Sequence, residues 1–426
     1  MSTNYLKDKK VAILGLGREG LSTLKFLKKN KIKPDVLDIK NDPKGVRKSG
    51  PYGAGKNYLD RIADYDLVFR TPGFPRLHPK LLAAEKKGIR VSSNTKLFFD
   101  LCPAKIIGIT GTKGKTTTTF LIYEILKSKF GKKVFIAGNF GKPALDILPK
   151  LTKKSLVVLE LSSFQLQDLS KSPDVAVITN ISIDHMDSSG KFGPATHQTE
   201  KEYFNAKINI VKHQKMAGLA VINKILKNKT KKIGRGKKIY CSPSPVETKL
   251  LGKHNLENIA LAVEVGKIFN VPKQKIIKAV KDFKGVKHRL EFVKKINDIS
   301  FYNDSAATNP DATLAALKSF KESLHIILGG SDKGLDYRKL ARFILKSKNI
   351  KSAALIGQIK NTLYKLIGPK KSKKIKTLKD AVLYLFKKSG KNEVVLLSPA
   401  AASFDMFESY AHRGKEFKKI VNRLRR

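Results

Sequence analysis

A run of glycines, threonines and lysines has the composition and spacing of a phosphate-binding loop. It reads Gly111-Thr112-Lys113-Gly114-Lys115-Thr116-Thr117, and it lies between the apolar stretch 106–109 and an apolar-periodic segment that includes Phe120. Backbone N–H groups in such a turn point to one spot, the lysine ammonium adds positive charge there, and a threonine hydroxyl can serve Mg²⁺. The spacing is looser than G-x-x-x-x-G-K-[ST], because the nearest glycine, Gly108, stands one residue early. We predict that the loop binds a nucleoside triphosphate and that a strand and a helix position it.

Three further polar side chains follow predicted strands in the same part of the chain: Asn139 after 134–137, Glu160 after 156–159, and His185 after 175–178. The carboxyl ends of parallel strands meet at one edge of a sheet, and that edge also holds the phosphate loop. We therefore expect a carboxylate and an imidazole beside the bound phosphates, where they could hold Mg²⁺. His185 by itself would be assigned as an ordinary surface histidine. Only its predicted proximity to Glu160 and Lys115 suggests a metal site.

The N-terminal segment carries a second glycine pattern. A predicted strand at 11–14 leads into Gly15-x-Gly17-x-x-Gly20 and a helix, and the next strand, 35–37, ends at Asp38. An acid belongs near that point in a dinucleotide fold, so the pattern taken alone predicts NAD. A third strand is predicted at 64–69, where the ligand-side turn Arg70-Thr71-Pro72-Gly73-Phe74 follows it. A glycine-rich loop is predicted at 45–55.

The C-terminal part again alternates strands with helices. The pattern breaks near Gly285, and His288-Arg289 begins a new segment in which polar and glycine-rich residues follow the predicted strands. These strands are predicted at 290–293, 300–302, 325–328, 353–356 and 394–397. The alternation predicts an α/β fold with three domains. We expect a Rossmann-like domain at 1–101, a central P-loop-type domain with a mostly parallel sheet at 102–285, and a Rossmann-like α/β domain at 286–426.

The composition indicates a globular protein of several domains. The chain has 426 residues, 41% of them hydrophobic, which is more than one core usually organises. No apolar run approaches the length of a membrane span and the N-terminus shows no signal-peptide pattern, so we expect a cytoplasmic protein. The two cysteines, Cys102 and Cys241, lack metal-ligand spacing, so we expect ordinary thiols.

The charge balance is strongly basic. The formal net charge is +51, from 86 basic and 35 acidic residues, which would normally suggest a nucleic-acid partner. The excess is mostly lysine, spread along the whole chain in runs such as 227–232 and 370–374, and no stretch interleaves aromatic residues with these bases. A solvated lysine-rich surface, which also suits anionic substrates, is therefore the favoured interpretation.

Together these segments resemble the Mur ligases, the ATP-dependent amide-forming enzymes of peptidoglycan precursor synthesis, over nearly the full chain. The shared motifs are Gly111–Thr116, Glu160–Leu166, Thr179-Asn180 with Asp184-His185, Gly252-x-His254-Asn255-x-x-Asn258, and His288-Arg289. Further motifs are similar to the members that add glutamate: Gly15-Leu16-Gly17, Thr71-Pro72-Gly73, Leu397-Ser398-Pro399-Ala400, Ser403-Phe404-Asp405 and Arg413-Gly414.

The resemblance implies a reaction and its partners. ATP, with Mg²⁺, would phosphorylate the carboxylate of UDP-N-acetylmuramoyl-L-alanine to an acyl phosphate, and the amine of D-glutamate would displace the phosphate. The N-terminal domain would then bind UDP, in place of the NAD that its glycine pattern predicts. We expect a monomer with no nucleic-acid or membrane partner.

The resemblance also implies roles for individual residues. Lys115, Glu160, His185 and Lys207 would be catalytic. Thr116 and Glu160 would hold one Mg²⁺ and His185 would help to hold another. Lys207, which by composition alone is a solvated helical lysine, would be carbamylated, and its new carboxylate would serve the metal site.

The remaining implied contacts fall into three groups. The UDP-sugar substrate would contact Leu16, Arg18, Glu19, Asp38, Lys40, Thr71, Pro72, Gly73 and Asn139. ATP would contact the loop 111–117 together with Asn255, Asn258, Arg289 and Asp304. The added amino acid would contact Thr308, Lys333, Ser403 and Tyr410.

Several alternatives stay open. Ala306 and Tyr410 depart from the familiar pattern, which leaves room for an L-glutamate-adding variant, and Arg18 and Glu19 differ from the familiar uracil-loop residues. Another superfamily member, such as the L-alanine-adding ligase or folylpolyglutamate synthase, is a second possibility, although a folate enzyme needs no UDP domain. A basic nucleic-acid-binding NTPase would show ATP hydrolysis stimulated by DNA or RNA. A catalytically silent scaffold is disfavoured because the predicted catalytic residues are retained.

Overall fold

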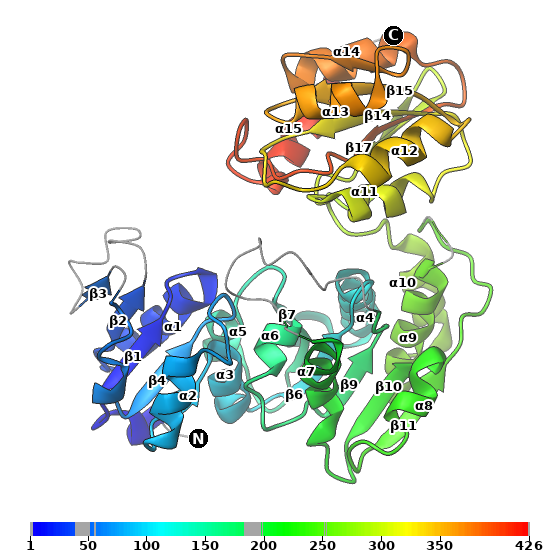
Figure 1. The fold of residues 1–426 in the computed structure, drawn as a ribbon. Coiled ribbons are helices and arrows are strands. Elements are labelled where there is room, and N and C mark those ends of the chain that lie inside the picture. The colour runs from blue at the N-terminus through cyan, green and yellow to red at the C-terminus, as the bar shows by residue number, and fades with distance from the viewer. Residues whose placement is uncertain are drawn as a thin grey trace. The chain divides into compact units, whose positions relative to one another are not determined.

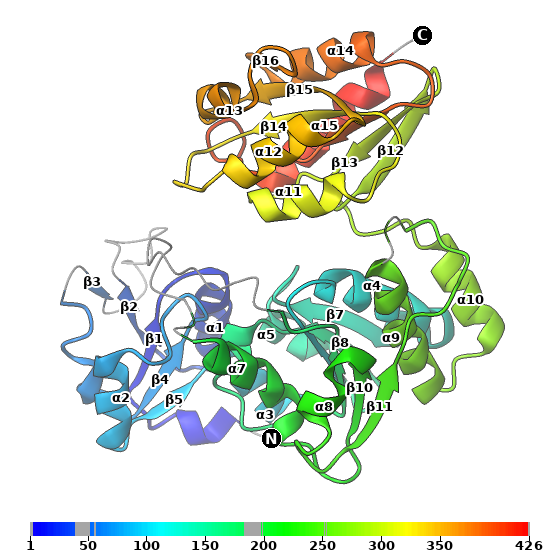
Figure 2. The same cartoon turned by 45° about the vertical axis from the view of Figure 1, so that its right-hand side comes forward.

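The computed structural model describes residues 3–38, 52–54, 57–182, 197, 199–250, 252 and 254–424. The chain divides into two compact units, one made of Met1–Val246 and Leu256–Lys281 and the other of Glu247–Asn255 and Asp282–Arg426. Among the described residues, the first unit contains an N-terminal and a central sheet and the second contains a C-terminal sheet (Figure 1, Figure 2). In the same part of the chain, no helix combines the length and apolar character needed to cross a bilayer.

The N-terminal sheet is parallel throughout, with its described strands in the order β3-β2-β1-β4-β5. A parallel sheet whose strand order reverses beside β1 opens a ligand crevice at the carboxyl end of that strand. The strands are β1 (Val11–Leu14), β2 (Asp35–Asp38), β3 (Tyr52–Ala54), β4 (Leu67–Arg70) and β5 (Arg90–Ser92), and the helices are α1 (Arg18–Lys29), α2 (Pro79–Lys86) and α3 (Asn94–Leu101).

Two predictions for this sheet are wrong in detail. The glycine-rich segment 45–55 is predicted as a loop, but Tyr52–Ala54 within it forms β3, which pairs with β2. A three-residue edge strand needs only main-chain hydrogen bonds to one neighbour, so its side chains give little pattern to detect. The strand predicted at 64–69 begins only at Leu67, because Ile62–Asp64 is a 3-10 helix and the Asp66 carboxylate accepts a hydrogen bond from the Lys10 N–H.

The central sheet is also parallel throughout, in the order β11-β10-β9-β6-β8-β7. Its middle strands are continuous apolar runs because helices cover both faces of such a sheet. The strands are β6 (Lys105–Thr110), β7 (Val134–Gly138), β8 (Leu156–Glu160), β9 (Val175–Ile178), β10 (Leu219–Asn223) and β11 (Lys237–Cys241). The helices are α4 (Lys115–Phe130), α5 (Ala144–Ile147), α6 (Ser163–Leu166), α7 (Glu200–Lys212), α8 (Lys227–Thr230), α9 (His254–Ile268) and α10 (Lys273–Asp282).

The C-terminal sheet has the order β12-β13-β17-β14-β15-β16 and is mixed, since β12 is antiparallel to β13. Alternate residues of β14 face two different cores: Ile326 packs with α11, α12 and α13, whereas Ile327 packs with α14 and α15. Helices therefore cover both faces, as in a Rossmann-like domain. The strands are β12 (Glu291–Ile296), β13 (Ile299–Asn303), β14 (Leu324–Gly329), β15 (Ile350–Ile356), β16 (Ser372–Lys374) and β17 (Val394–Leu397), and the helices are α11 (Pro310–Leu317), α12 (Arg338–Lys346), α13 (Lys360–Ile367), α14 (Leu378–Lys388) and α15 (Tyr410–Arg423).

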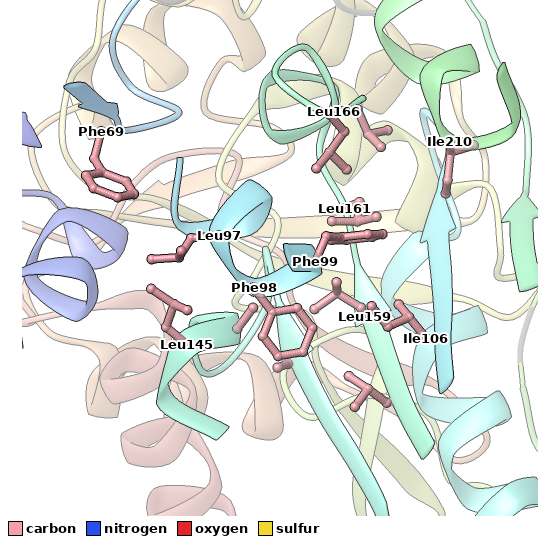
Figure 3. Packing of buried hydrophobic residues seen from close by; sticks show 14 of the residues in the cluster. Phe69, Leu97, Phe98, Phe99, Ile106, Leu145, Leu159, Leu161, Leu166 and Ile210 are labelled. Atoms are coloured by element: carbon pink, nitrogen blue, oxygen red, sulfur yellow. The ribbon is translucent and has the colours of Figure 1, made fainter. Parts of the chain in front are cut away.

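One hydrophobic core joins the N-terminal and central sheets. Helix α3 contributes Leu97, Phe98 and Phe99, which are less than a tenth exposed, to a cluster that also contains Leu159 and Leu161 of the central part (Figure 3). Because burial of large apolar side chains contributes roughly 1.5–3 kcal/mol for each one, this shared core is a strong constraint on the first unit. It fixes the ligand edge of one sheet relative to that of the other.

Candidate active site

The predicted phosphate loop is a turn that only glycine can complete. Gly111 (φ +150°) and Gly114 (φ +83°) occupy backbone conformations that other residues rarely adopt. A Cβ atom on Gly111 would lie 1.9 Å from Thr179 Oγ1, and one on Gly114 would lie 2.2 Å from Asn258 Oδ1. The Thr112 N–H donates to the Asn180 carbonyl at 2.8 Å, which ties the loop to the end of β9. The loop is therefore held tightly from two sides.

The cationic and hydroxyl side chains of the loop lie at the start of α4. Lys115 is the first residue of this helix, and its Nζ donates to the carbonyl oxygens of Gly111 (2.9 Å) and Thr112 (3.0 Å). Thr116 follows as a buried residue at the second position. The helix N-terminus, with Gly114 as its N-cap, adds backbone N–H donors and a positive dipole end. This arrangement favours a phosphate group.

Glu160 lies at the same edge, as the parallel-sheet argument predicts. The register pairs it with Ile109 of β6 on one side and with Gly138 of β7 on the other. Its carboxylate is 2% exposed; Oε1 accepts a hydrogen bond from Asn139 Nδ2 at 2.9 Å, whereas Oε2 is buried without a hydrogen-bond partner among the described residues. A Cβ atom on Gly138 would lie 2.1 Å from the Glu160 carbonyl oxygen, so glycine is required for Asn139 to reach the carboxylate.

Lys207 is not the solvated helical lysine that composition predicts. It is 2% exposed on α7, and its Nζ donates to the Gly111 carbonyl at 2.7 Å. Burial, and then the positive charge of Lys115, lower the pKa of Lys207 to about 6, although Glu160 acts in the opposite direction. At neutral pH this amine is therefore largely uncharged, in contact with the phosphate loop.

Two aromatic residues that the sequence does not single out complete the surroundings of Lys207. Tyr203, one helical turn earlier, places its ring 4.6 Å from the lysine Nζ and its hydroxyl 2.9 Å from Thr112 Oγ1. His197 stacks on Phe164 with ring centroids 4.6 Å apart, and its Nε2 lies 2.8 Å from Ser163 Oγ. The i, i+4 spacing on α7 is the signal that could have linked the tyrosine to the lysine.

Two predicted site residues, His185 and Lys40, lie outside the described residues. Of the residues predicted to serve a metal, the structure describes Thr116, Glu160 and Lys207.

The predicted UDP contacts converge at the carboxyl edge of the N-terminal sheet. The Leu16 N–H donates to Asp38 Oδ2 at 2.8 Å, and Thr71 Oγ1 donates to the Leu14 carbonyl at 2.8 Å. Gly15 (φ +86°) allows this approach, since a Cβ atom there would lie 2.7 Å from Thr71 Oγ1. The glycine turn, the end of β2 and the turn after β4, which includes Pro72 and Gly73, thus lie together at one edge of the sheet, where a switch in strand order is typical of a ligand crevice.

Arg18 and Glu19, also predicted to contact UDP, connect this crevice to the central part of the same unit. Arg18 donates to the backbone oxygens of Asn139 (2.5 Å) and Gly141 (3.1 Å). Glu19 is buried and accepts a hydrogen bond from Gln165 Nε2 at 2.5 Å, while its Oε2 has no hydrogen-bond partner among the described residues. Burial raises the pKa of Glu19 to about 7.

In the second unit, polar residues gather where β13, β14 and β17 end. Asp304 accepts hydrogen bonds from Ser398 Oγ (2.7 Å) and from the Leu290 N–H (3.2 Å), and burial raises its pKa to about 7. Ser403 is 1% exposed and its Oγ has no hydrogen-bond partner among the described residues. Lys333 Nζ lies 5.8 Å from the ring of Phe404.

A buried arginine that sequence reasoning did not assign to the site organises this edge. Arg413 on α15 is 1% exposed and donates to Ser305 Oγ (2.9 Å) and to the carbonyl oxygens of Ser305 and Ala401 (2.9 and 3.0 Å). The same helix begins at Tyr410, whose carbonyl accepts a hydrogen bond from Ser305 Oγ. The contacts of Arg413 therefore hold the segments that follow β13 and β17 together. Thr308, a predicted amino-acid contact, lies in the loop after β13.

The predicted adenosine contacts lie in two places. Asn258 on α9 is buried and accepts a hydrogen bond from Thr118 Oγ1 at 3.2 Å, so it packs directly on the phosphate-loop helix. Asn255, at the start of α9, is also buried. Arg289 follows His288, which has φ +66° and lies in the turn before β12.

Comparison with protein families matches all three parts of the chain. The descriptions are "Mur ligase MurD-like, N-terminal domain" for residues 9–93, "Mur ligase middle domain" for 109–242, and "Mur ligase, glutamate ligase domain" for 288–401. The UDP-N-acetylmuramoylalanine--D-glutamate ligase of Acetivibrio thermocellus is 36% identical over 98% of this chain and 97% of its own length. The enzyme of that name from Clostridium tetani is 35% identical over 99% of this chain and 98% of its own.

Solved structures share the fold. The UDP-N-acetylmuramate-alanine ligase of Thermotoga maritima superposes with a TM-score of 0.58 at 17% identity, covering 97% of this chain and 99% of that one. The MurF ligase of the same organism, in complex with ADP, also gives 0.58 at 17% identity, covering 99% and 97%. With full-length relatives at about 36% identity and family matches in all three parts, this chain belongs to the Mur ligase family.

Proposed function

We propose that this protein uses ATP to join D-glutamate to UDP-N-acetylmuramoyl-L-alanine in peptidoglycan precursor synthesis, in the cytoplasm. The observation that carries the proposal is the group around the Gly111 carbonyl. Lys115 and Lys207 both donate to this oxygen, and Glu160 lies at the neighbouring strand end. A buried carboxylate and two lysines at a phosphate loop suit phosphoryl transfer. The full-length relatives named as D-glutamate ligases support the choice of substrate.

In this proposal Lys115 and the start of α4 bind the ATP phosphates. The Lys115 ammonium leaves the carbonyls of Gly111 and Thr112 and turns to the phosphate oxygens, where its charge offsets that of the γ-phosphoryl group as it moves. The substrate carboxylate attacks the phosphorus and ADP leaves. The glutamate amine then attacks the acyl phosphate, forms the amide bond, and phosphate leaves with one oxygen of the former carboxylate.

The residues present fit Mg²⁺. Glu160 Oε2 is a buried carboxylate oxygen with no hydrogen-bond partner among the described residues, and a hard divalent cation prefers such an oxygen. Thr116 would supply a hydroxyl oxygen, and His185 is proposed for a second ion. When bound, the metal would neutralise charge on the phosphate oxygens. Asn139 holds the other oxygen of Glu160 and so fixes the orientation of the carboxylate.

Lys207 is proposed to be carbamylated. Its lowered pKa leaves the amine uncharged at neutral pH, and this is the form that reacts with CO₂. The nitrogen lone pair forms an N–C bond to CO₂ and one proton is released to solvent, so the lysine becomes an anion beside the metal site. Lys207→Ala should lose turnover and recover part of it with short carboxylic acids, whereas Lys212→Ala, at the end of the same helix, should need no additive.

The crevice in the N-terminal sheet is proposed to bind the sugar nucleotide, and the polar residues of the second unit are proposed to bind glutamate and the adenosine of ATP. Leu16, Asp38 and Thr71 line the crevice that would take the UDP of the sugar nucleotide. In the second unit, Ser403 would donate its buried hydroxyl, which has no hydrogen-bond partner in the described part of the chain, to a glutamate carboxylate, and Lys333 would pair with a carboxylate by charge. Thr308 and Tyr410 are proposed to complete the amino-acid site, and Asn255, Asn258, Arg289 and Asp304 to contact the adenosine.

ADP release tests the proposal. The assay combines ATP, Mg²⁺ and UDP-N-acetylmuramoyl-L-alanine with a panel of D- and L-amino acids. We expect ADP only when the sugar nucleotide and D-glutamate are both present. ADP release with L-glutamate in place of D-glutamate would show that the protein adds L-glutamate. ADP release that DNA or RNA stimulates without the sugar nucleotide would show a nucleic-acid-dependent NTPase and contradict the ligase.

A further inference from the structure

Arg70 makes an unusually complete set of buried contacts. It is the last residue of β4, it is 1% exposed, and its guanidinium donates in three directions. Nη1 donates to the Phe74 carbonyl at 2.6 Å and to the Thr71 carbonyl at 3.3 Å. Nη2 donates to the Phe164 carbonyl at 2.6 Å, and Nε and Nη2 both donate to Asp168 Oδ2, at 2.9 and 2.5 Å.

The partners of Arg70 belong to two different sheets of the first unit. Thr71 and Phe74 begin and end the turn after β4, which is next to the proposed UDP crevice. Phe164 lies on α6 and Asp168 just after it, and this helix directly follows the strand that ends at Glu160. One side chain therefore connects the turn at the nucleotide end with the helix next to the proposed metal ligand.

Asp168 also lies close to a second arginine, although its Oδ1 has no hydrogen-bond partner among the described residues. Its Oδ1 lies 3.1 Å from Arg76 Nε, and Arg76 in turn makes two hydrogen bonds with Glu85 on α2, at 2.7 and 2.8 Å. The Asp168 side chain is 1% exposed, whereas Arg76 and Glu85 are about a quarter exposed. The carboxylate thus lies between two arginines of the N-terminal part while its backbone belongs to the central part.

A buried ion pair usually contributes little net stability to a protein. Removing two charges from water is costly, and well-packed apolar residues often stabilise a protein as well or better. The pair does fix the orientation of the groups around it, because a planar guanidinium with five donors sets both the angle and the distance of its partners. The apolar core between the same sheets already supplies burial (Figure 3).

We propose that Arg70 and Asp168 are positioning residues that set the distance between the UDP crevice and the phosphoryl-transfer site. The sugar nucleotide is held at one end by the turn after β4 and reacts at the other end beside Glu160. Misplacing a reacting carboxylate by about 1 Å can cost on the order of a hundredfold in rate. The pair aligns the substrate by fixing one binding site relative to the other, and touches neither the substrate nor the reacting atoms. This inference rests on the proposed function.

The test separates positioning from stability with two readouts. Asp168→Asn keeps the shape of the side chain and removes its charge. We expect the Kd of UDP alone, measured by calorimetry, to change by less than about twofold, because each site stays intact. We expect kcat for the full sugar nucleotide to fall about tenfold or more, because the two ends are no longer aligned. Arg70→Lys, which keeps the charge and loses the fork of donors, should show the same separation and serves if the first variant does not fold.

The matched control is Leu81→Ala. Leu81 is fully buried in the N-terminal part, in a hydrophobic cluster separate from the one that joins the two sheets. It should lower the melting temperature without lowering kcat. The inference is overturned if the Asp168 and Arg70 variants keep wild-type kcat, if UDP binding falls by the same factor as kcat, or if Leu81→Ala reproduces the loss. Absence of wild-type turnover would instead overturn the proposed function itself.

Discussion

Replacing Lys207 with methionine should make the protein more stable while it removes activity. The wild-type lysine is 2% exposed, and burial lowers its pKa from 10.5 to about 6. The unfolded chain binds a proton at this amine up to pH 10.5, whereas the folded chain releases it above pH 6. The free energy of unfolding of the wild type therefore falls as pH decreases from 10.5, and the loss is complete below pH 6.

The size of the effect follows from the same values. Each tenfold change in proton affinity corresponds to about 1.4 kcal/mol, so the buried lysine costs up to about 5 kcal/mol at pH 7 relative to strongly alkaline pH. Methionine avoids this cost and fills a similar volume. It loses the hydrogen bond to the Gly111 carbonyl, worth about 1 kcal/mol, but that oxygen still accepts from Lys115. A net gain of about 4 kcal/mol at pH 7 is expected.

Urea unfolding followed by far-UV circular dichroism, in CO₂-depleted buffer, measures this prediction. The stability difference between Lys207→Met and wild type should shrink by about 1.4 kcal/mol per pH unit between pH 7 and pH 9. Lys212→Met, on the same helix but exposed, should give no such slope. A difference that stays constant with pH would refute the assignment of an uncharged buried amine, whatever the effect on turnover.

Three further predictions concern other parts of the site. Lys115→Ala should abolish product formation with an unchanged circular dichroism spectrum, whereas Lys127→Ala on the same helix should keep wild-type turnover; near-wild-type activity of the first would remove the phosphate-loop assignment. Glu160→Ala should raise the Mg²⁺ concentration needed for half-maximal rate, so an unchanged Mg²⁺ titration would argue against its role as a ligand. The pKa of Glu19 is raised from 4.5 to about 7, so the free energy of unfolding of the wild type falls as pH rises from 4.5 through 7. Glu19→Gln should therefore be more stable than wild type at pH 8 but not at pH 4. Parallel pH profiles of the two proteins would contradict this.

The phosphate loop and the position of Glu160 could be predicted because their signals are local. A short apolar run followed by glycines and Lys115 indicates a strand, a turn and a helix without any knowledge of distant contacts. The alternation of strands and helices then places Glu160 at the same edge, and the register with Ile109 bears this out. The same logic brought Leu16, Asp38 and Thr71 together.

The residues that sequence reasoning missed depend on distant partners. Arg70 and Asp168 are 98 residues apart, and nothing in either neighbourhood indicates that they pair. Lys207 is assigned to the site through the family resemblance alone, since by composition it looks like the many other lysines of the chain and its burial depends on what packs against that helical face. The strand β11 (Lys237–Cys241) lies at a sheet edge and carries two lysines, so its apolar pattern is weak.

The most direct test of phosphoryl transfer to the substrate follows an oxygen atom. The UDP-N-acetylmuramoyl-L-alanine carboxylate is labelled with ¹⁸O, and the phosphate released with ATP, Mg²⁺ and D-glutamate is analysed by mass spectrometry. Transfer of the γ-phosphoryl group to the carboxylate predicts one ¹⁸O atom in each phosphate released by amide formation. Unlabelled phosphate, formed at the same rate as the amide product, would contradict an acyl-phosphate intermediate at this site.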